Sequence, residues 1–328
     1  MVSTKIIVAV IVIAAGMMLA GVGIGYAAWG TTNQVTPPPS TITLTISGST
    51  TEYPIVADAA TQFEALYPNY DVQVSQGGSS VGVSNVEANV SDIAMSSSAL
   101  GASDYAKDAK LNATIVARDG IAIILNAELA TAGNFSSLNF TATWIKMIYN
   151  GSWTNWNQVP TWTGSAGGHA IDVNSREYGS GTRASFEKFV MNNTITGNGV
   201  CSYVAGMVVD QGSPALNTSV CGDPWAIGYI GVGFVTTHVT AVLVNAATVA
   251  AQNHGGAGVG PFYACTVANV LTMTYPLSRY LYMITNGPRT LPELNFINFM
   301  VGPVGQQCVI EQGFVSILAN PNPPGEFP

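Results

Sequence analysis

Hydrophobic positions along the chain follow the spacing of strands and helices in turn. Residues 41–46 alternate polar and β-branched side chains, which predicts a strand. Residues 53–67 carry apolar side chains at helical spacing, and Pro68 ends that helix. The same succession continues with a strand at 71–74, a short helix at 81–90 and a strand at 92–95. This alternation predicts an α/β fold with a parallel sheet.

The pattern extends almost to the end of the chain. Further strands are expected at 120–126, 171–174, 226–234, 240–244 and 280–284, and helices at 138–149, 183–191, 291–301 and 305–312. Segments 120–126 and 275–284 are the candidates for connections between two lobes. The predicted lobes are residues 41–122 plus 281–328 and residues 123–280, separated by a cleft that a hinge opens and closes.

A long apolar segment precedes the folded part. Residues 6–28 are nearly long enough to cross a bilayer, which takes about 20 residues, whereas a cleaved signal usually has an apolar region of about 7–15. Small residues at Gly25 and Ala27 leave cleavage as the alternative. We expect residues 1–29 to be a signal or anchor helix and the Pro-rich residues 30–40 to be a linker. Both alternatives place the rest of the chain outside the cytoplasm, at the cell surface.

Composition narrows the function classes. Charged residues make up 9 % of the chain, against roughly 25 % in an ordinary soluble domain. The net charge of -8 argues against nucleic acid as a partner, because such proteins present a basic surface. Hydrophobic residues make up 48 %, which excludes disorder of the whole chain. No C-x-x-C motif is present and no His stands at ligand spacing from a Cys, so we expect neither a zinc site nor a cofactor.

Cysteines and asparagines fit an exported protein. We favour the disulfides Cys201–Cys221 and Cys265–Cys308, because each closes the shorter loop in sequence; four free thiols are the alternative. Seven N-x-S/T sequons predict a glycosylated surface. Their asparagines are Asn89, Asn112, Asn134, Asn139, Asn150, Asn192 and Asn217.

Three loops rich in Gly, Ser and Thr share one position in the predicted fold. They span residues 47–51, 77–80 and 179–182, and each follows a strand and opens a helix. Hydroxyls and free backbone N–H groups at a helix N-terminus bind anions. In an open α/β sheet such loops lie at the carboxyl ends of strands, where ligands bind. Any one loop alone is better explained by ordinary capping, but three such loops in register, with an Arg and an Asp nearby, favour an anion site.

Two charged residues accompany these loops. Arg176 lies four residues before Ser180, and its planar fork of donors matches phosphate oxygens; an ion pair with Glu177 is the alternative. Asp92 can only accept hydrogen bonds, so it would favour a protonated oxyanion and reject sulfate. A turn residue is the alternative for Asp92.

Seven segments in order resemble the phosphate-binding component of phosphate ABC importers, which has the two-lobed type II periplasmic-binding-protein fold. They are GSTTEYP (48–54), GGSSVGV (77–83), DIAMSS (92–97), IYNGSWTNWNQV (148–159), REYGSGTRASFEKFV (176–190), AIGYIGVGFV (226–235) and YPLSRYLY (275–282). The resemblance implies a set of phosphate ligands in this chain. They are Thr50, Thr51, Ser79, Ser80, Asp92, Arg176, Ser180, Gly181 and Thr182.

The chain departs from this family at two places. Relatives often carry an Arg after the DIAMSS-like serines, where this chain has Ser98. Some carry an Asp two residues after the binding Arg, where this chain has Tyr178, with Glu177 beside it. These departures bear on affinity and on its pH dependence.

The resemblance implies an extracytoplasmic solute-binding protein that captures inorganic phosphate and delivers it to ABC permease subunits. An enzyme is disfavoured, because His169, His238 and His254 are the only histidines and no nucleophile elbow accompanies them. One alternative is a structural protein of a filament or surface layer built on the same fold. Another is a binder of a different tetrahedral oxyanion.

Overall fold

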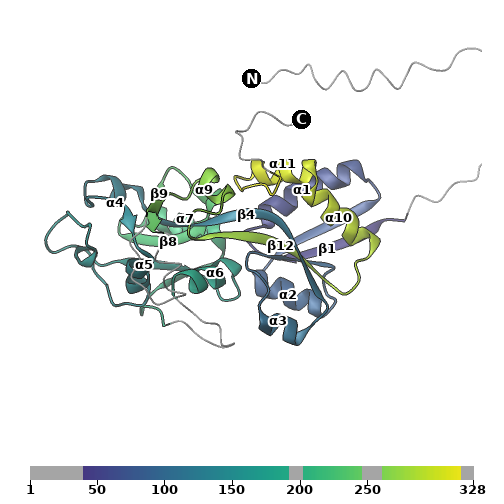
Figure 1. Cartoon of the computed structure of the whole chain (residues 1–328), viewed down its shortest axis with the longest axis horizontal. Coiled ribbons are helices and arrows are strands. Elements are labelled where there is room, and N and C mark those ends of the chain that lie inside the picture. Colours follow the sequence, from purple (N-terminus) through teal and green to yellow (C-terminus); the bar gives the residue numbers. More distant parts are fainter. Residues whose placement is uncertain (1–39, 192–201, 246–260, 319–328) are drawn as a thin grey trace, which may run out of the picture. The chain divides into compact units, whose positions relative to one another are not determined.

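The computed structural model describes residues 40–191, 202–245 and 261–318. From Thr41 onward the chain is one compact unit built around a nine-stranded sheet with the strand path β2-β1-β3-β12-β4-β8-β6-β7, to which β9 adds beside β4 (Figure 1). The strands are β1 (Ile42–Gly48), β2 (Tyr70–Gln76), β3 (Ile93–Ser96), β4 (Leu111–Asn126), β6 (Asp172–Arg176), β7 (Val208–Asp210), β8 (Ala226–Gly231), β9 (Val239–Ala241) and β12 (Ser278–Asn286). A second, three-stranded sheet joins β5 (Asn139–Phe140), β10 (Leu243–Asn245) and β11 (Phe262–Tyr263).

The predicted parallel sheet is present at both ends of the strand path but not in its middle. β1 pairs in parallel with β2 and β3, and β6 pairs in parallel with β7 and β8. β4 and β12 pair antiparallel with each other and with their outer neighbours β8 and β3. β4 is the longest strand: residues 111–120 pair with β12 and residues 121–125 with β8, so this strand connects the two parallel regions.

Helices cover both faces of the sheet. In the β1–β3 half, α1 (Tyr53–Leu66), α10 (Leu291–Val301) and α11 (Pro303–Glu311) lie on one face, and α2 (Ser79–Glu87) and α3 (Ala102–Lys107) on the other (Figure 1). The β6–β8 half carries α4 (Ala127–Thr131), α5 (Ala142–Tyr149), α6 (Gly181–Phe189), α7 (Gly212–Gly222) and α9 (Val267–Leu271), with short 3-10 turns at Trp156–Gln158 and Val232–Phe234.

Two large hydrophobic clusters divide along β4 and β12. Val116 and Ala117 of β4 belong to the cluster under α1, α10 and α11, whereas Ile121 belongs to the cluster around α5 and α6. On β12 the same change falls between Leu277, which precedes the strand, and Leu281. Both connecting strands therefore pass from one apolar core to the other within four residues.

Several sequence-based bounds need correction. The helix predicted at 138–149 begins at Ala142, because Asn139 and Phe140 pair with β10. The strand predicted at 120–126 begins at Leu111. The helix predicted at 291–301 has these bounds in the structure.

The predicted disulfide Cys265–Cys308 is wrong. Both residues have free thiols, and they pack in different hydrophobic clusters, so their closeness in sequence does not bring them together in space. Cys221 also has a free thiol, and its predicted partner Cys201 lies outside the described residues.

The described residues bear on only part of the membrane and glycosylation predictions. The apolar segment 6–28 and the linker up to residue 39 lie outside the described residues. Within the described ranges no helix is long and apolar enough to span a bilayer. Of the sequon asparagines, Asn192 lies outside the described ranges; the other six are exposed or partly exposed, and their glycosylation stays a prediction.

Candidate functional site

Three helix N-termini meet where β1, β2 and β6 end. The loop after β2 is hydrogen-bonded to the loop after β1, because the N–H groups of Gly77 and Gly78 both donate to the Gly48 carbonyl at 2.9 Å. The loop after β6 joins them, because Ser80 N–H donates to the Gly179 carbonyl at 3.1 Å. The first turns of α1, α2 and α6 therefore lie around one point, as the sequence predicts.

Side-chain contacts cross between the two halves at this point. Thr51 Oγ1 and Thr182 Oγ1 share a hydrogen bond of 2.8 Å, and both residues are fully buried. Arg176 Nη2 donates to Thr50 Oγ1 at 2.6 Å. The hydroxyls of the first loop thus meet the arginine and the threonine of the third.

Glycine is required where the loops approach most closely. A Cβ on Gly181 would lie 2.3 Å from Ser79 Oγ and 2.6 Å from Ser97 Oγ, far inside van der Waals contact. Gly78 has φ +96°, and a Cβ there would lie 3.0 Å from the Gly179 carbonyl oxygen. The backbone amides of α6 can therefore come within reach of the serine hydroxyls.

The first turn of α6 offers free donors. The Ser180 hydroxyl accepts from Arg183 N–H and caps the helix. Gly181 and Thr182 head the helix, so their N–H groups have no partner inside it. With the positive end of the helix dipole, this turn favours an anion.

Arg176 is completely buried at the centre of the site. Its Nε donates to Glu177 Oε2 at 2.9 Å and its Nη2 to Glu177 Oε1 at 3.0 Å, while Nη1 donates to Ser213 Oγ at 2.9 Å. Burial alone would raise the pKa of Glu177, but the hydrogen bonds and charge of Arg176 outweigh burial and lower it. The ion pair with Glu177 and the contact with Thr50 therefore coexist.

A second buried ion pair escaped the sequence analysis. Asp119 on β4 and Arg279 on β12 are joined by bonds of 2.6 and 2.9 Å. Arg279 also donates to Thr182 Oγ1 at 2.9 Å and to the Ser97 carbonyl at 2.8 Å. Arg279 is the one charged residue in the apolar segment 275–284, and that pattern is the signal from which the pair could have been found.

A third arginine, Arg183 on α6, contacts the backbone of Arg176. Arg183 donates to the Arg176 carbonyl at 2.9 Å and pairs with Glu187 at 2.8 Å. Its guanidinium stacks on the ring of Tyr178 at 4.2 Å, and Tyr178 is 72 % exposed. Tyr178 therefore turns away from Arg176, and Glu177 supplies the carboxylate beside it.

Asp92 does not belong to the site. It is exposed, and its Oδ2 accepts from both the N–H and the hydroxyl of Thr45 at 2.7 Å. The reason is topological: Asp92 precedes β3, which is parallel to β1, so it lies beside Thr45 in the middle of β1, whereas the loops follow the carboxyl ends of the strands. The prediction that Asp92 accepts the ligand proton is therefore wrong.

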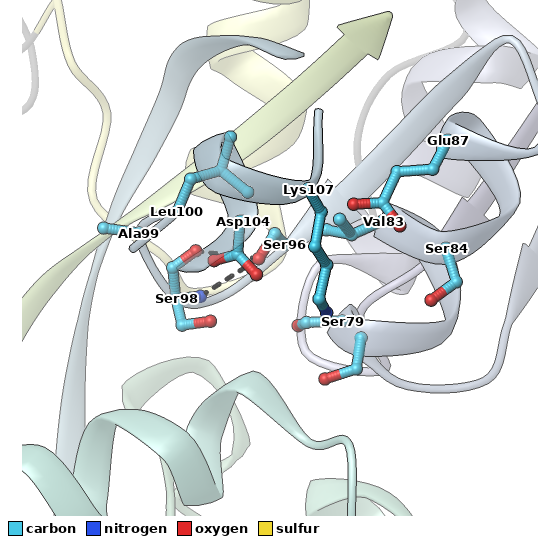
Figure 2. Close-up of a pocket in the computed structure, with 11 residues that line it drawn as sticks. Ser79, Val83, Ser84, Glu87, Ser96, Ser98, Ala99, Leu100, Asp104 and Lys107 are labelled. Carbon is cyan, nitrogen blue, oxygen red and sulfur yellow. Dashed lines mark hydrogen bonds between the residues drawn. The ribbon is translucent and has the colours of Figure 1, made fainter. Parts of the chain in front are cut away.

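Ser79 and Ser80 differ in placement. Ser79 is buried and accepts from Ser97 N–H at 3.1 Å, whereas Ser80 is exposed. Both line a pocket of about 110 Å³ beside α2 and α3 (Figure 2). Ser98 lines this pocket, and the side chain of Lys107 extends toward Ser79 in Figure 2.

The remaining chemistry of the described residues is limited. No group of His, Cys, Asp and Glu in the described ranges could hold a metal ion. His169 is exposed and stacks on the Trp225 ring with the centroids 3.5 Å apart. His238 is exposed, and His254 lies outside the described residues.

Comparison with known proteins gives a consistent result. A family model described as the PBP superfamily domain matches residues 33–304. The phosphate-binding protein PstS of Bacillus subtilis (strain 168) is 26% identical over 285 residues, which is 84% of this chain and 80% of that protein.

Solved structures agree with the sequence matches. A substrate-binding protein from Clostridium perfringens, solved with bound phosphate, is similar with a TM-score of 0.68 and 29% identity over 84% of this chain and 100% of its own. An ABC-type phosphate transport receptor from Vibrio cholerae has a TM-score of 0.64 and 28% identity, over 83% of this chain and 99% of its own.

Proposed function

Since the chain belongs to the PBP superfamily, we propose that it captures inorganic phosphate outside the cytoplasm and delivers it to an ABC importer. The similarity to phosphate-binding proteins over more than four-fifths of the chain supports this ligand. Capture needs no chemical step, so we infer a binding protein and not an enzyme.

One observation carries the proposal: hydroxyls and amides from three helix N-termini lie together, and a buried arginine contacts the first of them. Phosphate oxygens are acceptors, and the donors facing this point are Arg176, the hydroxyls of Thr50, Thr51 and Thr182, and the free amides of α6. Ser79 adds a further hydroxyl. Charge-assisted bonds of this kind are about twice as strong as neutral ones.

Binding would replace contacts that the loops now make with each other. Thr51 and Thr182 bond one another across the two halves, as do Thr50 and Arg176. We propose that residues 41–122 plus 281–328 and residues 123–280 are lobes that separate by bending β4 and β12. The change of hydrophobic cluster along both strands supports this hinge.

Selectivity between oxyanions needs an acceptor other than Asp92. Two carboxylates beside the donors, Glu177 and Asp119, are each held by an arginine. A carboxylate oxygen repels an unprotonated oxyanion and accepts the proton of a protonated one. We propose that these two groups give any preference for phosphate over sulfate.

The remaining parts of the chain suit a protein at the cell surface. We propose that residues 1–29 hold it at the membrane and that the linker 30–40 presents the binding unit to the permease. We also propose that sequon asparagines on the surface, such as Asn89 and Asn112, carry glycans.

The deciding experiment is calorimetric titration of the full chain, purified in mild detergent and freed of ligand, with phosphate and with sulfate at pH 5 and pH 8. Tight binding of phosphate alone supports the proposal. Binding of sulfate with equal affinity would make the chain a general oxyanion binder. No binding of either ion to folded protein would contradict the proposal.

A further inference from the structure

A buried carboxyl group lies next to the site and has no part in the contacts described above. Glu52 directly follows Thr50 and Thr51 at the start of α1, and it is fully buried, with 0 % of its surface exposed. Among the described residues, neither of its carboxyl oxygens accepts a hydrogen bond of good geometry, and the Tyr282 backbone amide makes only a weaker contact. An unpaired buried carboxylate is far more costly than an uncharged carboxylic acid, so such a group keeps its proton.

The groups that face Glu52 come from two strands. Arg279 on β12 favours the charged form, and Asp119 on β4 opposes it. The backbone amide of Tyr282, also on β12, favours the charged form, and the Tyr282 phenol lies close enough to interact with the carboxyl. Burial is the largest effect and raises the pKa of Glu52 well above its usual range.

Arg279 connects Glu52 to the anion site. Its guanidinium is held by Asp119 and donates to Thr182 Oγ1, which in turn bonds Thr51 Oγ1. With Glu52 uncharged, Arg279 has one carboxylate partner. An ionised Glu52 would be a second carboxylate near Arg279 and would add a negative charge beside the bound anion.

We propose that Glu52 is a positioning residue that keeps the anion site competent only while it carries a proton. The inference rests on the proposed function. When the lobes separate, the Thr51–Thr182 bond breaks and water reaches the start of α1, so Glu52 ionises more readily. Closure around an anion then takes up the proton again.

The direction of the pH effect follows from this difference. The closed form holds the proton of Glu52 more tightly than the open form. In the open form the pKa of Glu52 therefore lies nearer its ordinary value of 4.5. At a pH between the pKa of Glu52 in the open form and its pKa in the closed form, the protein takes up about one proton when it binds the anion. In this range the affinity for the anion falls by up to about tenfold per pH unit as pH rises. Below the ordinary value Glu52 is protonated in both forms, and its contribution is constant.

The test counts protons. Phosphate is titrated into the full chain in two buffers of different ionisation enthalpy, with wild type and Glu52→Gln compared from pH 5 to pH 8. Gln keeps the shape of a protonated Glu but cannot ionise. We expect wild type to take up more protons than Glu52→Gln and to lose affinity relative to it as pH rises. The proton equilibria of phosphate itself contribute equally to both proteins.

A matched control and two readouts separate the outcomes. Glu128→Gln, on the exposed first turn of α4, should behave as wild type. Equal proton uptake by wild type and Glu52→Gln, with phosphate bound by both, would overturn the inference and leave the proposed function intact. No phosphate binding by wild type at any pH would overturn the proposed function itself.

If Glu52→Gln fails to fold, judged by its circular dichroism, the infrared difference spectrum of wild type on adding phosphate decides. Growth of the protonated-carboxyl band supports the inference. An unchanged band overturns it.

Discussion

Most of the N–H groups of the Arg176 guanidinium already donate hydrogen bonds to protein groups before any ligand binds. Four of its five N–H groups have partners in the protein, two on Glu177 and one each on Ser213 and Thr50. Glu177 holds the guanidinium in place through two bonds. The neutral hydroxyls of Thr50 and Ser213 are the partners that an anion can displace, so the arginine is oriented before binding.

Replacing Arg176 by Ala should weaken phosphate binding by about 2–5 kcal/mol, because the principal positive charge on a buried anion is lost. Calorimetry measures the loss. The variant also leaves Glu177 buried without its partner, so the double variant Arg176→Ala with Glu177→Gln separates lost binding from lost stability. Arg289→Ala, far along the chain beside α10, should bind as wild type. Unchanged affinity in Arg176→Ala would refute the site.

Asp92→Asn should leave both phosphate affinity and the preference over sulfate unchanged, because Asp92 is exposed beside the middle of β1 and bonds Thr45, not a residue of the site. The variant loses only the charge of an exposed carboxylate that accepts from Thr45, which costs about 1 kcal/mol of stability. Titration with both ions and a thermal melt measure these effects. A variant that gains sulfate binding would restore Asp92 to the site.

Residue types were easier to predict than residue partners. Arg176, Thr51 and Thr182 stand in loops whose composition shows anion chemistry, and the structure brings them together. The role of Asp92 was assigned from its neighbours in sequence, which do not say at which end of a strand a residue lies. Arg279 was missed because its partner Asp119 is 160 residues away.

At the scale of elements, the site depends on how closely α6 approaches the loop before α2. The amides of Gly181 and Thr182 can face a ligand only because residue 181 lacks a side chain where it meets the hydroxyls of Ser79 and Ser97. The third loop thus provides its donors through its backbone as well as through its side chains.

Gly181→Ala should weaken phosphate binding by at least about tenfold, or about 1.4 kcal/mol, because the added Cβ displaces the Ser79 and Ser97 hydroxyls and moves the first turn of α6. Calorimetry measures the affinity. Gly167→Ala is the matched control, since a Cβ there would meet nothing within 4 Å. Equal affinities in the two variants would show that the close approach is unimportant for binding.

Elements with a regular hydrophobic periodicity were predicted well. Elements whose existence depends on pairing with a distant strand were not. The helix at 291–301 has a capping box at Thr290 and Glu293 and was found with its observed bounds. The first half of β4 was missed because several of its side chains remain exposed or half-buried, so it shows no apolar run. The strand at Asn139 and Phe140 exists only because β10 lies beside it.

For the whole molecule, the two connecting strands are the least predictable feature. The sequence predicts crossovers at 120–126 and at 275–284, but nothing in the pattern shows that residues 278–286 pair antiparallel with residues 111–120. Their pairing joins both halves of the chain through a single ladder. It also brings Asp119 and Arg279 together behind the site.

The pairing of each buried arginine with its own carboxylate governs how the ligand arrives. Arg176, Arg183 and Arg279 are balanced by Glu177, Glu187 and Asp119, and the chain as a whole carries -8. Such a site exerts little pull on an anion beyond roughly 10 Å, the screening length at 0.1 M salt. Encounter is then governed by diffusion alone, without electrostatic steering.

We therefore expect the association rate constant for phosphate, measured by stopped-flow fluorescence, to change less than about twofold between 0.05 and 0.5 M sodium chloride. A steep fall with salt would reveal a guiding positive field that these balanced pairs do not provide. A receptor of this kind would capture phosphate at the same rate at low and at high ionic strength.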